Sequence, residues 1–155
     1  RFTLTLINAG AGHKIPTGDP DRHFTVEFLV QDRDGHVLDR RSETMGRWLL
    51  WQPVVLEGYD NRLLPLASRE YRFAYRLPAQ TEGLTLKATV RYHILTDGQH
   101  EMLEKKYGLT AKDPYAFTIY EWDMPLSSEL AAALLHEEQD PRLGCKAEGG
   151  VTKAG

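Results

Sequence analysis

The longest stretch of strict period-two alternation in the chain runs Leu84-Thr-Leu-Lys-Ala-Thr-Val-Arg-Tyr-His-Ile94, with an apolar side chain at every even position. Successive side chains of a β-strand point to opposite faces, so this pattern predicts a long strand with one buried face and one polar face. No helix-period pattern precedes or follows it at the spacing of a βαβ unit. The stretch therefore favours an antiparallel β-protein.

Shorter runs of the same kind lie on both sides of it, at residues 2–6, 24–30, 71–77 and 117–122. Asp32-Arg-Asp-Gly35 supplies turn residues before a return strand that begins at Val37. Six or seven strands separated by turn signals predict an all-β fold, an immunoglobulin-like antiparallel β-sandwich of two packed sheets. The side chains expected inside it are Phe24, Val26, Phe28, Val30, Phe73, Leu86, Ala88 and Val90.

The strand patterns end near Pro125, which divides the chain into a β-sandwich domain, 1–125, and a C-terminal helix with a flexible tail, 126–155. Ser127 or Ser128 would cap that helix, and an apolar face within 130–135 would pack it. Two segments are ambiguous. Residues 48–66 give a mixed signal, in which Trp48-Leu-Leu-Trp51 continues a strand or covers an open end of the core, and residues 100–107 predict at most one helical turn.

Composition excludes several classes of function. A net charge of −3 and a pI near 6.1 give no reason to expect a nucleic-acid partner. No apolar run approaches the ~20 residues that a membrane-spanning helix needs. Cys145 is the single cysteine, so the chain forms no internal disulfide, no thiolate zinc cluster and no C-x-x-C-H haem attachment. We expect Cys145 and the residues after Gly144 to serve as a linker or a partner contact.

One long loop carries the candidate functional histidine. It runs from Asn8 to His23 between two strand patterns and is interrupted by glycine and proline, which indicates a fixed shape rather than a solvated linker. His13 lies at its centre, beside Gly12. Because imidazole is the commonest metal ligand among side chains, His13 is the first candidate for chemistry.

Other metal sites are weaker hypotheses. Asp32 and Asp34 suggest calcium, but they lack the downstream glutamate of an EF-hand, and a hairpin turn explains them better. His13 and His23 flank one loop and could share a free metal with a carboxylate in an enzyme. The absence of a spaced ligand set makes this hypothesis the weakest.

The amino-acid sequence of the loop resembles that of a known family. The string Gly12-His-Lys-Ile-Pro-Thr-Gly18, a following strand entered at Arg22, and an Asp32-x-Asp-Gly turn are similar to the C-terminal β-domain of certain multihaem c-type cytochromes. The resemblance extends through Asp60-x-Arg62 and covers roughly the first hundred residues. The chain departs from that family because the haem-binding portion that normally precedes this domain is not in it.

The resemblance implies a periplasmic or cell-surface electron-transfer protein. It implies that haem c is attached to a partner segment or chain and that His13 is the distal axial ligand of the haem iron. It also implies that the assembly exchanges electrons with a redox partner protein. The opposing interpretation is a structural cap whose loop packs against protein. In either case the chain itself is expected to do no bond-making chemistry, and homo-oligomerisation is left open.

A third interpretation comes from a different class of protein. A secreted immunoglobulin-like adhesion or carbohydrate-binding module would use exposed Trp48, Trp51 and Tyr59 as its binding surface. The simpler expectation for Trp48, Trp51 and Trp122 is packing in the core or between domains. Arg22 is expected to pair with Asp19 or Asp21 and brace the loop, or to meet a haem propionate. Residues 59–62 are expected to form a turn with an ion pair.

Overall fold

The computed structural model describes residues 1–50, 53–78, 81–108, 115–127 and 129. The chain forms β1 (Phe2–Ile7), β2 (His23–Gln31), β3 (Val37–Met45), β4 (Arg47–Leu50), β5 (Leu56–Asp60), β6 (Ser68–Phe73), β7 (Leu84–His93), α1 (Asp97–Tyr107) and β8 (Ala116–Leu126), in that order. All strand pairs are antiparallel. The expectation of an all-β sandwich is confirmed.

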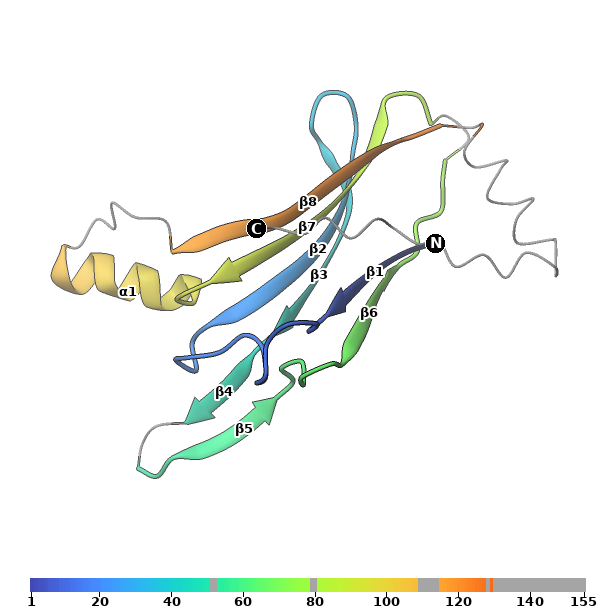
Figure 1. Ribbon diagram of the computed structural model, residues 1–155. Helices are drawn as coiled ribbons and strands as arrows, with labels where there is room; N and C mark the ends of the chain where they lie inside the picture. The colour runs from blue at the N-terminus through green and yellow to red at the C-terminus, as the bar shows by residue number, and fades with distance from the viewer. Residues whose placement is uncertain (51–52, 79–80, 109–114, 128, 130–155) are drawn as a thin grey trace.

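Two sheets enclose the core. The larger has the strand order β3-β2-β7-β8, and the smaller pairs β1 with β6 and faces it (Figure 1). The long alternating stretch of the sequence forms β7. This strand is flanked by β2 and β8, and it buries every even position from Leu84 to Val90. Phe28 of β2 stacks on Phe73 of β6 at a ring-centroid distance of 5.4 Å, which ties the two layers together.

The predicted interior is confirmed for seven of the eight side chains, and Phe24 is half-buried near the start of β2. The buried cluster comprises Val26, Phe28, Val30, Tyr71, Phe73, Leu84, Leu86, Ala88, Val90 and Leu126. Phe2, Leu4 and Leu6 of β1 pack against it from the smaller sheet.

The one long helix of the described chain was underestimated from the sequence. In place of a single turn, α1 has 11 residues and begins at Asp97, after the N-cap Thr96. The Thr96 hydroxyl accepts from the backbone of Gln99, and the Gln99 side chain accepts from the backbone of Thr96. This capping box was the available signal. The apolar pattern gave none, because α1 buries no residue.

The predicted C-terminal helix and tail, with Cys145, lie outside the described residues except at their start. Leu126 ends β8 and is buried, so the strand runs one residue past the predicted boundary at 125. The strand expected over 71–77 lies earlier in the chain than predicted, because β6 begins at Ser68 and ends at Phe73.

Two tryptophans do not pack in the core, one of the two places expected for them, and packing between domains stays a prediction. Trp48 is 51% exposed on the β4–β5 hairpin, which projects from the sandwich (Figure 1). Trp122 is 39% exposed on β8, opposite Ala88. Trp51 lies outside the described residues. Segment 48–50 thus continues a strand and does not cover the core.

Among the described residues, no helix has both the length and the apolar character needed to cross a membrane.

Candidate functional site: the His13 loop

The loop between β1 and β2 is anchored by a buried amide. Asn8, 2% exposed, follows the last residue of β1. Its Nδ2 donates to the carbonyl of His13 at 2.8 Å and to that of Leu63 at 3.3 Å. Its Oδ1 accepts from the backbone of Ala11 at 3.2 Å. One side chain therefore satisfies three backbone groups and fixes the turn that carries His13.

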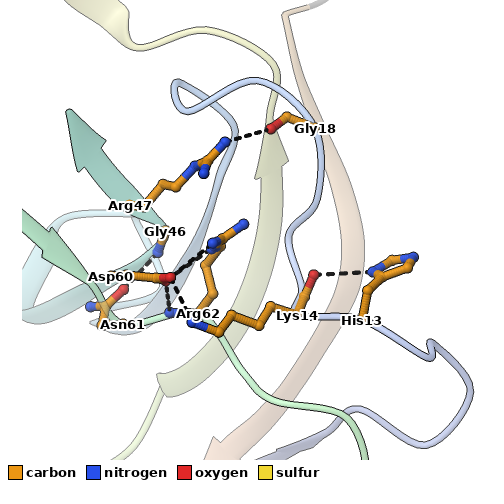
Figure 2. Close-up of polar contacts among 8 residues, drawn as sticks. All are labelled: His13, Lys14, Gly18, Gly46, Arg47, Asp60, Asn61 and Arg62. Carbon is orange, nitrogen blue, oxygen red and sulfur yellow. Dashed lines mark hydrogen bonds and ion pairs between the residues drawn. The ribbon is translucent and has the colours of Figure 1, made fainter. Parts of the chain in front are cut away.

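A second anchor joins the loop to the segment after β5. Ile15 and Leu63 exchange backbone hydrogen bonds of 3.0 and 2.9 Å, and the peptide bond between Ile15 and the buried Pro16 is cis. Lys14 Nζ lies 2.8 Å from Asp60 Oδ2 (Figure 2).

Asp60 is the electrostatic centre of this anchor. Its side chain is 9% exposed and also accepts two hydrogen bonds from the Arg62 guanidinium, at 2.9 and 2.8 Å. Arg62, with Lys14 in support, holds the pKa of the Asp60 carboxyl well below its usual range despite burial, and Asp60 raises the pKa of Arg62. The ion pair expected within residues 59–62 is therefore present, and it lies beneath the His13 loop.

His13 stands on the exposed side of this anchored loop. Its Nδ1 is 3.1 Å from the carbonyl oxygen of Lys14 (Figure 2). Because a carbonyl only accepts, the contact favours the tautomer with the proton on Nδ1. The lone pair of the neutral ring then belongs to Nε2, which makes no hydrogen bond to any described residue.

Arg22 does not make the expected side-chain pair with Asp19 or Asp21. Its Nη1 donates to the hydroxyl of Tyr92 at 3.3 Å, and its backbone nitrogen donates to the carbonyl of Asp19 at 3.0 Å. The bracing of this part of the loop comes instead from Arg47, whose Nη2 donates to the carbonyl of Gly18 at 3.2 Å (Figure 2).

His23 is not brought to His13 as a second metal ligand. Its ring stacks on His93 of β7, with centroids 4.4 Å apart and planes inclined by 10°. His93 also lies 3.1 Å from the Thr25 hydroxyl. Burial, with His23 as the next cause, lowers the pKa of His93. A stacked pair presents its nitrogens side by side, which is not an arrangement for holding one ion.

The described residues contain one group of three or more potential metal ligands, Asp32, Asp34 and His36, whose ligand atoms lie within 4.8 Å of one another. They form the exposed turn between β2 and β3. Asp32 accepts from the backbone of Asp34 and of His36, at 2.9 Å each, and its other oxygen lies 3.1 Å from His36 Nδ1. The carboxylate is thus used by its own turn, as the hairpin interpretation expects.

Sequence reasoning missed three partners of the loop: Lys14 with Asp60, Arg47 with Gly18, and Asn8 with Leu63. Each joins residues 29 to 55 positions apart. The one available signal was the Asp60-x-Arg62 string, which the family resemblance had included.

No protein-family model and no curated protein matches this chain. A solved structure does, described as a penta-heme cytochrome c552 from Thermochromatium tepidum. The TM-score is 0.59 at 22% sequence identity, over 80% of this chain and 35% of that one. The shared feature is the fold. The chain spans about a third of the length of the cytochrome that it matches.

Proposed function

We propose that this chain is the non-haem β-sandwich domain of a multihaem cytochrome c electron-transfer assembly, in which His13 supplies the distal axial ligand to a haem carried by another segment or chain. The observation that carries the proposal is the exposed His13 ring. Its Nδ1 contacts the carbonyl of Lys14, and its Nε2 makes no hydrogen bond to a described residue.

The anchoring of the loop supports this role. A metal-binding imidazole is ordinarily oriented by a hydrogen bond from its second nitrogen to a carbonyl or carboxylate. His13 has a contact of this kind from Nδ1 to the carbonyl of Lys14, and Asn8 holds the carbonyl of His13 itself. Little ordering of the loop would remain to be done on ligation, which favours binding.

The haem would bring its own iron and its proximal ligand, and this chain would contribute one neutral imidazole. The single cysteine means that no haem is attached through a C-x-x-C-H motif of this chain. The likeness in fold to part of a penta-heme cytochrome supports a haem-bearing neighbour, and a periplasmic or cell-surface location follows as part of the same proposal.

The assembly is tested by isolating the native protein with an antibody to this domain and measuring haem c by the pyridine haemochrome spectrum. We expect haem c in stoichiometric amount, either on the same polypeptide or on a chain that remains bound in high salt. Native protein free of haem c would reject the proposal.

One observation favours a second function, a carbohydrate-binding module. On the β4–β5 hairpin, Trp48 and Tyr59 are paired across the strands and are 51% and 50% exposed. A Cβ at Gly58 would lie 2.2 Å from the Trp48 ring, so the indole lies close against that glycine. An aromatic face held in this way can stack on a sugar ring.

Glycan-array binding by the wild-type chain, lost in Trp48→Ala and kept in Trp122→Ala, would favour this module. If the wild-type chain binds no glycan, the carbohydrate-binding function is rejected and the cytochrome proposal is the one that remains.

A further inference from the structure

Three buried polar side-chain atoms in the described part of the chain have no hydrogen-bond partner: Arg22 Nε, Arg47 Nε and His93 Nδ1. All three belong to one end of the larger sheet, where β2 begins, β3 passes into β4, and β7 ends. Buried polar groups are nearly always satisfied, and an exception calls for an explanation such as a bound water or ion. Two of these three atoms belong to guanidinium groups.

Arg22 and Arg47 are neighbours on the fold. The β2–β3 register ends at the pair Phe24–Met45. Continued outward, it would set His23 opposite Gly46 and Arg22 opposite Arg47. The close approach is visible at Gly46, where a Cβ would lie 2.9 Å from His23 Cβ and 3.3 Å from the carbonyl oxygen of Arg22.

Both guanidinium groups meet the same turn of the loop. Arg47 Nη2 donates to the carbonyl of Gly18 at 3.2 Å, and a Cβ at Gly18 would lie 3.0 Å from Arg22 Nη1. Gly18 has φ of 95°, so it has the backbone freedom to form this turn over the two cations.

Neither arginine has a carboxylate partner among the described residues. The nearby Asp60 is shared by Lys14 and Arg62, and Asp19 Oδ1 accepts from the backbone of Asp21 at 3.4 Å. By contrast, Arg40, Arg41 and Arg72 on the exposed strands are each paired with a glutamate. Two half-buried arginines therefore lie at one turn without a carboxylate in direct contact, and buried charged groups of this kind are usually paired.

We propose that Arg22 and Arg47, under the Gly18 turn, form a binding site for the oxyanion of a carboxylate or phosphate group. Arg22 has Nε and Nη2, and Arg47 has Nε and Nη1, without a hydrogen bond to a described residue, and these are the donors that the anion would engage. The planar fork of a guanidinium matches the two oxygens of such groups. The site does not depend on haem ligation by His13, because a free anion would occupy it equally.

The site is tested by recording the arginine Nε–Hε NMR signals of the folded chain while inorganic phosphate or acetate is added at constant ionic strength. We expect saturable shifts of the Arg22 and Arg47 signals, with the Arg72 signal unchanged. Tighter binding of phosphate would assign the site to phosphate groups, and tighter binding of acetate would assign it to carboxylates, which include haem propionates.

Arg47→Lys keeps the charge and removes the fork, and it should weaken binding by about tenfold. Arg72→Lys, at an exposed arginine paired with Glu70, is the matched control and should not change it. The proposal is overturned if neither anion gives a saturable shift, if Arg72 responds in parallel with the other two, or if Arg47→Lys binds as tightly as the wild type.

Discussion

The loop between β1 and β2 and the turn between β2 and β3 each present an exposed histidine directly after a glycine, yet they are held in different ways. The turn is held locally, since Asp32 bonds to Asp34 and His36 within four residues. The loop is held from a distance, through Asn8 to Leu63 and Lys14 to Asp60. The first arrangement keeps a hairpin closed. The second fixes the backbone that carries His13 relative to the sandwich, as the proposed ligand role would require.

The largest effect that separates the two regions is expected at Asp60. Asp60→Asn should lower the free energy of unfolding by about 3 kcal/mol, because it leaves the half-buried Arg62 and Lys14 without their shared anion. Urea denaturation at pH 7 measures this. Asp32→Asn is the matched control and should cost much less, because its turn is exposed to solvent.

The acid limb of the same measurement follows from the sign of the Asp60 pKa shift. Its folded-state pKa lies below the ordinary value of 3.8, so Asp60 stabilises the fold above that pH and the contribution is lost as the pH falls further. Asp60→Asn should therefore flatten the stability profile between about pH 5 and pH 2. An unchanged acid limb would show that this carboxylate does not hold the loop.

The second effect concerns Asn8. Asn8→Ala should lower the free energy of unfolding by about 2 kcal/mol, because the carbonyls of His13 and Leu63 lose a buried donor. Amide exchange should rise in residues 9–15 and stay unchanged in the turn at 32–36. Equal changes in both regions would mean that the loop has no anchoring of its own.

A third, smaller effect compares two glycines. Gly46→Ala should cost about 1–2 kcal/mol, because the new Cβ would lie 2.9 Å from His23 Cβ at the point where the loop enters β2. Gly12→Ala has open space around it and should change stability by less than about 0.5 kcal/mol. Thermal unfolding of the two variants side by side checks the contrast, and a reversed order would contradict the close approach.

The smallest effect is a shift in titration at the end of the loop. NMR should give His93 a pKa below 6.5, so that this histidine stabilises the fold above that pH and the contribution is lost as the pH falls through the folded-state pKa. His23→Gln should move the pKa of His93 upward, because it removes the stacked neighbour. His36→Gln, in the other region, should leave it in place.

The same contrast explains what the sequence could predict. Period-two alternation located β7 and most of its buried side chains, and turn residues located the hairpin at Asp32, because both signals are local. Helix α1 was underestimated because it packs no apolar face, although Thr96 and Gln99 carried a capping signal. Packing of Trp48 in the core was a wrong alternative, because the sequence does not show that the hairpin which carries it projects from the sandwich.

The candidate site was predictable only in part. His13 stood out from the glycines and prolines around it and from the family resemblance. Its anchors did not, because the bonds from Asn8 to Leu63 and from Lys14 to Asp60 join segments that meet only after the sandwich has formed. The approach of Arg22 and Arg47 to the Gly18 turn likewise joins residues that are distant in the sequence.

The role of His13 is tested most directly by the electron paramagnetic resonance spectrum of the intact haem-bearing assembly with His13→Ala, beside His36→Ala as control. We predict that His13→Ala converts one low-spin haem to a high-spin or water-ligated form while the β-sandwich stays folded, and that His36→Ala changes nothing. A haem spectrum identical to wild type in His13→Ala would contradict ligation and leave this domain as a structural cap.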